Sequence, residues 1–407
     1  LQYNVPEGWY ITNPNDPYAR INELRQLIDE IHHAGMRVIM DVVYNHVYDA
    51  LTFPFNILVP GYFYRYDERG IITNVSGCGN DVASEKRMTS KFILDSVRYW
   101  MNNYNLDGFR FDLMGLLDVE TMTNAFMIVK TADPCGMVYG EGWNMPSNIP
   151  EEDRANMNNY MLMPEIGFFN DQFRDKLKGS QWTKSLGFTS GGRTSYLDLM
   201  YLVTGSCIDN YLFASPNQSI NYVECHDNFT YFDFLSEVAP NLPAEQKKDY
   251  MALALSIVLV SQGVPFIHSG QEFFRTKQGV ENSYKSPDEI NMVNWSRCDE
   301  NWEFVEMVRD LIAIRNEYNI FRNDKKSIIK ERFKLSSKSN NSQSVCVSGK
   351  GVDERFYVIF KNNYEQEYYD FETVMTLIFN SRKRVNTICE SVSLDKPGVY
   401  ILRKGRE

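Results

Sequence analysis

Apolar positions in the first part of the chain follow two spacings in turn. Between residues 21 and 31 they recur at the spacing of one helix face, and Gly35 predicts the end of that helix. Residues 37–43 follow directly and are almost continuously apolar, which is typical of a parallel strand buried on both faces. A helix followed by a buried strand is therefore the first predicted unit.

This unit repeats along the chain. The pattern predicts further helices at residues 93–104, 122–129 and 250–260, and further strands at 108–112, 135–139, 161–169, 220–224 and 264–268. Such alternation predicts an α/β fold with a parallel sheet. No glycine-rich phosphate loop of an open doubly wound sheet is present. Polar residues instead gather where strand after strand ends, which favours a (β/α)8 TIM-type barrel, since that fold carries its active site there.

The strand count stops at six, so we expect the first one or two strands of the barrel to lie before Leu1. After Arg322 the sequence pattern changes to short runs of strand-forming residues separated by turn residues. The predicted domains are therefore an incomplete catalytic barrel over residues 1–322 and a C-terminal antiparallel β-sandwich over residues 323–407.

Charge and composition narrow the class of partner. The chain carries 42 Lys and Arg against 53 Asp and Glu, a net charge of −11, which disfavours nucleic acid. The apolar run at 250–260 is too short to span a membrane, so no membrane partner is expected. The seven cysteines form no CxxC pair, which favours a reducing, cytoplasmic setting over a secreted one without fixing the localisation.

Three acids stand at predicted strand ends: Asp112, Glu141 and Asp227. Glycoside hydrolysis needs two carboxyl groups, one as acid/base and one that attacks the sugar or activates water. Arg110 lies two residues before Asp112, so on a strand both side chains point to one face, where the guanidinium could keep Asp112 ionised. A purely structural ion pair inside the barrel is the alternative for Arg110 and Asp112.

Four motifs lie at the predicted strands, in order along the chain. They are Asp41-Val42-Val43-Tyr44-Asn45-His46, Gly108-Phe109-Arg110-Phe111-Asp112, Gly140-Glu141-Gly142-Trp143 and Val223-Glu224-Cys225-His226-Asp227-Asn228. In this order they resemble the signature regions of the α-amylase superfamily, glycoside hydrolase family 13. The resemblance implies a retaining mechanism with Asp112 as nucleophile, Glu141 as general acid/base and Asp227 as transition-state stabiliser. It also implies that Arg110, His46, His226 and Asn228 hold the nucleophile and the sugar.

Within that superfamily the chain most resembles the type I pullulanases, which cleave α-1,6 branch links. The stretches that carry this likeness are residues 3–8, 77–85 and 166–171, and Trp143 after the Glu-Gly pair is typical of debranching members. The likeness covers essentially the whole chain, but the hallmark Tyr-Asn-Trp-Gly-Tyr-Asp-Pro segment is absent. We therefore expect a piece of a longer enzyme.

The resemblance implies hydrolysis of α-1,6-glucosidic links in pullulan, amylopectin or glycogen-derived dextrins, with a branched α-glucan as partner. The alternatives are a branching transferase, an α-1,4 hydrolase or an inactive glucan-binding fragment. No cofactor is expected, although Asn45 matches a calcium ligand of some α-amylases. A metal-dependent hydrolase is disfavoured because the five histidines form no ligand set.

Several other residues allow two interpretations. His268 ends the last predicted strand, where a satisfied buried histidine is favoured over a residue lining the site. Tyr62, Tyr64 and Tyr66 alternate like a strand face and suit either sugar stacking or core packing, as do Trp9 and Trp295.

Overall fold

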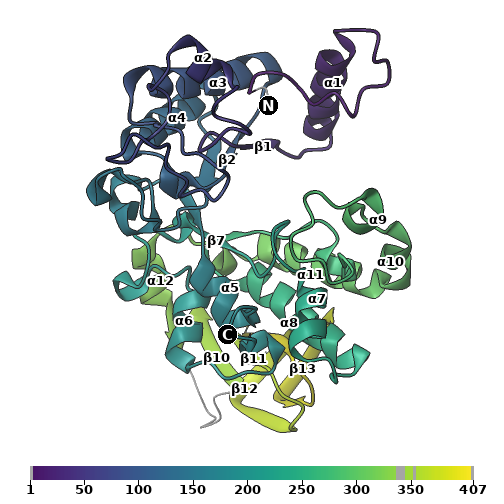
Figure 1. The fold of residues 1–407 in the computed structure, drawn as a ribbon. Coiled ribbons are helices and arrows are strands. Elements are labelled where there is room, and N and C mark those ends of the chain that lie inside the picture. The colour runs from purple at the N-terminus through teal and green to yellow at the C-terminus, as the bar shows by residue number, and fades with distance from the viewer. Residues whose placement is uncertain (1–2, 336–343, 352–353, 405–407) are drawn as a thin grey trace. The chain divides into compact units, whose positions relative to one another are not determined.

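A computed structural model describes residues 3–335, 344–351 and 354–404. The chain divides into two compact units, Leu1–Phe169 and Asn170–Glu407 (Figure 1), and each is described by itself. The boundary predicted after residue 322 lies inside the second unit. The strands of the C-terminal antiparallel sheet of that unit begin at Phe333. The domain boundary at residue 322 stays a prediction.

The first unit contains a parallel sheet in the order β1-β2-β3-β4, with helices between the strands. Its strands are β1 (Ile39–Val42), β2 (Gly108–Phe111), β3 (Met137–Gly140) and β4 (Gly167–Phe169). Its helices are α1 (Ala19–His33), α2 (Pro54–Leu58), α3 (Arg87–Tyr104) and α4 (Val119–Ala132), with 3-10 turns η1 (Met114–Leu116), η2 (Glu151–Asp153) and η3 (Met157–Leu162). The helices and strands predicted for this part of the chain are confirmed.

Burial differs between the strands of this sheet. All four residues of β2 are buried, whereas in β1 only Val42 is buried and Asp41 is exposed. The burial of β1 predicted on both faces is therefore wrong. Among the described residues of this unit β1 pairs only with β2, and a cavity of about 770 Å³ borders it, lined by residues of β1 and by Leu24 and Leu27 of α1.

The second unit combines a helical layer with two kinds of sheet. The parallel strands β7 (Ser219–Asn221) and β8 (Val264–Pro265) pair with each other and confirm the last two predicted strands. A short hairpin is formed by β5 (Gly179–Ser180) and β6 (Ser185–Leu186). The helices are α5 (Asp171–Lys178), α6 (Tyr196–Val203), α7 (Tyr231–Val238), α8 (Ala244–Val260), α9 (Asp288–Asn291), α10 (Trp295–Glu300), α11 (Trp302–Glu317) and α12 (Lys326–Arg332), with 3-10 turns η4 (Phe188–Ser190), η5 (Ile208–Asn210), η6 (Pro216–Gln218), η7 (Gln271–Phe273) and η8 (Asn319–Phe321).

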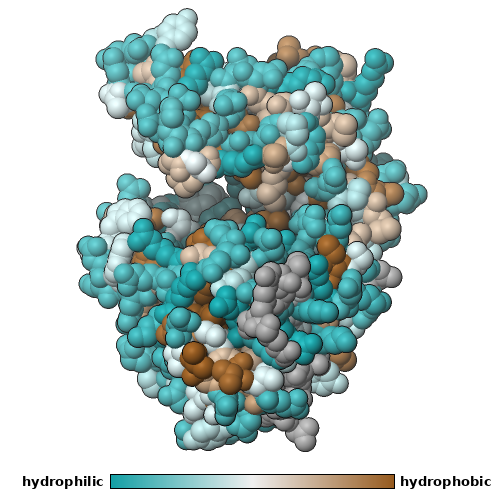
Figure 2. Space-filling view, turned by 180° about the vertical axis from the view of Figure 1, so that it is seen from behind, coloured by the Kyte–Doolittle hydropathy of each residue, from teal (hydrophilic) through white to brown (hydrophobic). Residues whose placement is uncertain are grey.

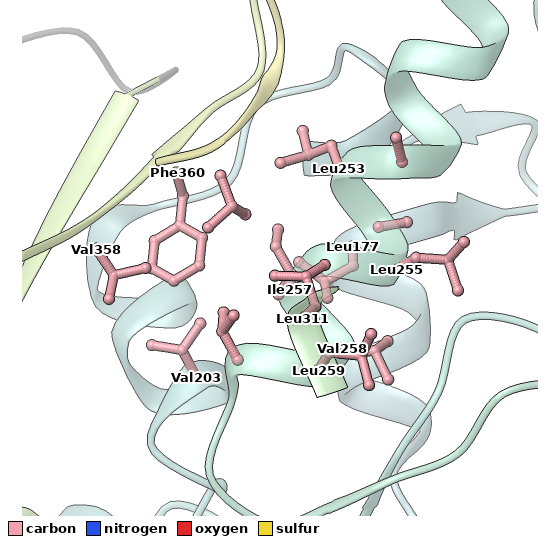
Figure 3. Packing of buried hydrophobic residues seen from close by; sticks show 14 of the residues in the cluster. Leu177, Val203, Leu253, Leu255, Ile257, Val258, Leu259, Leu311, Val358 and Phe360 are labelled. Carbon is pink, nitrogen blue, oxygen red and sulfur yellow. The ribbon is translucent and has the colours of Figure 1, made fainter. Parts of the chain in front are cut away.

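Helix α8 is the centre of the core of this unit. Its residues from Asp249 to Val260 are all buried, as expected for a helix that is apolar on every side. Figure 3 shows Leu253, Ile257 and neighbouring α8 side chains packing towards Leu311 of α11 and towards the ring of Phe360 from the C-terminal sheet. One hydrophobic cluster therefore joins the helical layer to that sheet.

The C-terminal strands form one antiparallel sheet in the order β13-β12-β14-β11-β10-β9. They are β9 (Phe333–Leu335), β10 (Ser344–Lys350), β11 (Arg355–Lys361), β12 (Glu367–Asn380), β13 (Lys383–Leu394) and β14 (Gly398–Lys404). Residues 336–343, 352–353 and 405–407 of the predicted domain lie outside the described residues. The predicted C-terminal antiparallel β structure is confirmed, and its hydrogen-bonded strands are continuous in one sheet.

Each face of this sheet carries a cluster of buried apolar side chains. One face packs on α8 and α11 through Val358, Phe360 and Ile401. Side chains of the other face, among them Ile359 and Leu402, cluster with Tyr369 and Leu394 from the far ends of β12 and β13. The register of these two strands shifts between Asp370 and Met375, so the long hairpin departs from regular pairing. Two apolar layers thus arise from one continuous sheet.

The face of the molecule in Figure 2 is mostly hydrophilic. On the face in Figure 2, apolar side chains lie in separate patches among hydrophilic ones. Within the described part of the chain, no helix combines the length and apolar character needed to cross a bilayer.

Candidate active site

Polar side chains follow the carboxyl ends of the parallel strands in the first unit. Asp112 comes directly after β2, Glu141 directly after β3, and His46 four residues after β1. The backbone fixes these positions, because Asp112 N donates to Val42 O at 3.0 Å and Glu141 N to Phe111 O at 3.1 Å. The sheet thus places the two acids on neighbouring strands at one edge, as the strand pattern predicts.

Arg110 connects the carboxylates of this unit. Its Nη1 lies 2.9 Å from Asp112 Oδ1 and 2.9 Å from Asp41 Oδ1, and its Nη2 lies 2.8 Å from Glu141 Oε1. The side chain of Arg110 is 7% exposed, that of Glu141 11% and that of Asp112 20%. A planar guanidinium can hold several carboxylates in fixed directions, so Asp112 and Glu141 are oriented by one rigid group.

The electrostatic balance at Arg110 follows from these contacts. Burial opposes its charge, but the carboxylates of Glu141, Asp41 and Asp112 outweigh burial and raise the pKa of Arg110 above its ordinary value. Arg110 therefore keeps its positive charge among the three carboxylates that it contacts.

Asn45 also holds Asp112 by hydrogen bonds, and His46 in turn contacts Asn45. Asn45 Nδ2 donates to Asp112 O at 2.7 Å and to Asp112 Oδ2 at 2.9 Å. His46 Nδ1 lies 2.6 Å from Asn45 Oδ1, and because that oxygen can only accept, Nδ1 carries the proton. Burial lowers the pKa of His46, although the charges of Asp112 and Asp81 oppose the change. A neutral His46 has the lone pair of Nε2 available for a hydroxyl donor.

Tyr3 explains the position of the His46 loop. Its hydroxyl donates to His46 O at 3.1 Å, and its ring stacks on Tyr44 at 5.3 Å between centroids. Trp100 Nε1 donates to Tyr3 O at 2.9 Å and ties this segment to α3. The N-terminal stretch of the pullulanase resemblance thus supports the loop after β1.

Close backbone packing shapes the loop that carries Glu141 and Trp143. Gly115 N donates to Glu141 O at 2.9 Å. A Cβ at Gly115 would lie 2.1 Å from Trp143 O, so the turn after β2 can approach this loop only with glycine there. Leu113 N also donates to Glu141 Oε2 at 3.1 Å, which orients the second carboxyl oxygen. The half-buried Trp143 follows on this loop.

The remaining predicted site residues belong to the second unit. His226, Asp227 and Asn228 follow β7, with His226 Nε2 3.4 Å from Asp227 Oδ2 and the two side chains 57% and 53% exposed. Asn228 adopts the left-handed conformation with φ of 60°. The structure thus brings Arg110, Asp112, Glu141, Asn45 and His46 together in one unit, and His226, Asp227 and Asn228 together in the other.

His268 is a satisfied buried histidine, as favoured from the sequence. Its Nδ1 donates to Glu224 Oε1 at 2.9 Å, and its Nε2 accepts from Arg275 Nη1 at 3.3 Å. Glu224, whose side chain is fully buried, was overlooked although it lies inside the fourth signature region. Asp41 was overlooked too, although it opens the first region and pairs in register with Arg110.

The aromatic residues that allowed two interpretations differ in their burial. Tyr64 is fully buried in a small cluster with Val47 and Phe55, which supports the packing interpretation. Trp9 and Trp295 are 90% and 67% exposed. Among the described residues no group of three or more His, Cys, Asp or Glu side chains is arranged to hold a metal ion. Asn45 directs its amide nitrogen to Asp112.

Comparison with known proteins gives consistent matches. The pullulanase of Bacillus subtilis (strain 168) is 48% identical over 326 residues, which cover 79% of this chain and 45% of that protein. The crystal structure of B. subtilis type I pullulanase complexed with maltose superposes with a TM-score of 0.96 at 40% identity, covering 100% of this chain and 59% of that one.

A second solved structure agrees. The pullulanase of Paenibacillus barengoltzii in complex with maltohexaose and α-cyclodextrin gives a TM-score of 0.93 at 38% identity and covers 100% of this chain and 64% of that one. The chain thus spans about half to two thirds of the length of the proteins it matches. No family model matches the chain.

The parallel α/β sheet and the C-terminal antiparallel sheet are those of the matched pullulanases, which are glycoside hydrolases of the α-amylase superfamily. Within it, the chain is a homologue of the type I pullulanases, the debranching enzymes of that superfamily, and corresponds to part of their length.

Proposed function

We propose that the whole protein hydrolyses α-1,6 branch links of α-glucans such as pullulan, amylopectin or glycogen-derived dextrins by double displacement. The observation that carries the proposal is the contact of one guanidinium, that of Arg110, with both Asp112 and Glu141. Retaining glycosidases need two carboxyl groups about 5–5.5 Å apart. Two carboxylates on one planar guanidinium are close enough neighbours to suit that requirement.

In the first step, Glu141 donates its proton to the glycosidic oxygen while the bond from that oxygen to the anomeric carbon breaks. Asp112 Oδ forms the new bond to that carbon, which gives a covalent glycosyl-enzyme. In the second step, Glu141 takes a proton from water as the water oxygen bonds to the anomeric carbon and Asp112 leaves. Two inversions retain the configuration.

Other residues take supporting roles in this proposal. Arg110 and Asn45 orient Asp112, since both donate to its carboxylate. His46, neutral through burial, accepts a sugar hydroxyl at Nε2. Trp143, His226 and Asn228 contact the sugar, and Asp227 stabilises the positive charge of the transition state; the signature motifs assign these four roles.

The test is to incubate the whole protein with pullulan and to follow reducing ends, with linear amylose as comparison substrate. We expect maltotriose from pullulan and no product from amylose. Asp112→Asn should lower turnover by about 1,000-fold or more, because the nucleophile is lost while its shape is kept. Asp95→Asn, the same change at a half-exposed aspartate of α3, is the matched control and should retain activity.

Three outcomes would contradict the proposal. Cleavage of amylose would indicate an α-1,4 hydrolase, and new branches in the products would indicate a transferase. Full turnover in Asp112→Asn would refute the role given to Asp112.

A further inference from the structure

The segment His226–Asn228 is held at both of its ends by side chains that have no role in the proposal so far. Asn228 has φ of 60°, a conformation that is uncommon for residues other than glycine. The side chains of His226 and Asp227 in this segment are each more than half exposed to solvent. An exposed segment with a left-handed residue needs contacts from its surroundings to keep one geometry.

Lys277 supports the first end. Its ammonium donates to His226 O at 3.1 Å and to Glu281 O at 2.8 Å. The residue is 2% exposed, and a buried ammonium is costly unless hydrogen bonds compensate it. Its backbone N donates to Asp233 Oδ2 at 2.7 Å, which attaches the Lys277 loop to the first turn of α7. The lysine is thus itself fixed.

Gln181 supports the other end. It follows β5, and its Nε2 donates to Asn228 Oδ1 at 2.9 Å and to Glu281 Oε1 at 2.8 Å. Glu281 therefore accepts from Lys277 through its carbonyl and from Gln181 through its carboxylate. The two supports meet at one residue, and the segment lies between them in a closed network.

Charged and titratable groups also surround the ammonium of Lys277. Asp227 and Cys225 from the segment after β7, Asp233 from α7 and Arg275 from its own loop all face Lys277. Burial lowers the pKa of Lys277, while the negative charge of Asp227 opposes that change.

We propose that Lys277, Gln181 and Glu281 are positioning residues, which form a clamp that fixes His226–Asn228 in the geometry needed for Asp227 to act. The role of Asp227 rests on the function proposed above. The clamp itself concerns the conformation of the segment, and it can be tested without substrate.

The first measurement is hydrogen exchange of the backbone amides of residues 223–230 in the whole protein. Lys277→Met keeps the aliphatic stem and removes the donors, so exchange should become about tenfold faster. The matched control is Lys330→Met, since Lys330 belongs to the same unit but is 67% exposed and paired with Asp209. Exchange in Lys277→Met equal to that in the control would overturn the clamp.

The second measurement is turnover of pullulan by the same variants. A misplaced catalytic segment lowers kcat more than it weakens binding, so we expect kcat to fall by up to about 100-fold in Lys277→Met with KM changed less than about threefold. Gln181→Met should act in the same direction. Unchanged kcat in both variants would also overturn the proposal.

The two hypotheses fail separately. If the wild-type protein releases nothing from pullulan, the proposed function fails, and the exchange measurement still decides whether Lys277 holds the segment.

Discussion

At the scale of single residues, buried charges dominate the chemistry of this chain. Arg110 is surrounded by three carboxylates and is stabilised as a cation. Lys178, at the end of α5, has the opposite environment. It is 4% exposed, and its ammonium lies 5.2 Å from the centroid of the Phe234 ring. Burial, reinforced by the charge of Arg174, lowers the pKa of Lys178 to about 8.

That shift predicts a dependence of stability on pH. Between pH 8 and the ordinary lysine pKa of about 10.4, the unfolded chain binds a proton that the folded chain does not, so this group makes the unfolding free energy rise with pH. Below pH 8 its charged form costs about 3 kcal/mol in the folded state. Lys178→Met should therefore stabilise the protein most at pH 7, and the gain should shrink towards pH 10.

Urea unfolding of wild type and Lys178→Met from pH 7 to pH 10 measures this effect, with Lys330→Met as control. A stability difference that stays constant across this range would contradict the interpretation of Lys178.

At the scale of secondary-structure elements, the site depends on close approach between the loops that follow β2 and β3. Gly115, in η1, has Trp143 O where a Cβ would be, at 2.1 Å. Gly140, which ends β3, would direct a Cβ to within 2.5 Å of Phe111 O. The backbone that presents Glu141 is thus packed from both sides without space for a methyl group.

Gly115→Ala should therefore displace the Glu141 loop. A shift of about 1 Å in a catalytic group can cost about 100-fold in rate, so we expect a loss of that order in pullulan turnover. Gly8→Ala is the matched control, because its Cβ would meet only the flexible Arg20 side chain at 3.6 Å. Equal activity of the two variants would show that the loop can relax.

The elements themselves follow well from the sequence. The sequence predicts α1, α3 and α4 from apolar residues at helical spacing, α8 from one long apolar run, and the six parallel strands from short apolar runs between the helices. The long β13 was not predicted, since its exposed positions leave little apolar alternation. The support network was missed as well. Gln181, Lys277 and Glu281 lie on loops far apart in sequence, where no periodicity indicates which side chains will meet.

At the scale of the whole molecule, the described units combine a parallel α/β layer with an antiparallel sheet that shares a core with α8 and α11. The signature motifs locate the acids after the strands, and the fold explains why: the carboxyl ends of neighbouring parallel strands share one edge. The geometry around Arg110 agrees with a reaction through two carboxylates, whose stereochemical outcome is the central claim.

The most direct test is proton NMR of the whole protein acting on pullulan, recorded before the products mutarotate. The account predicts that the new reducing ends appear first as the α-anomer, since displacement by Asp112 and then by water inverts the centre twice. First appearance of the β-anomer would mean a single displacement and would contradict the roles given to Asp112 and Glu141.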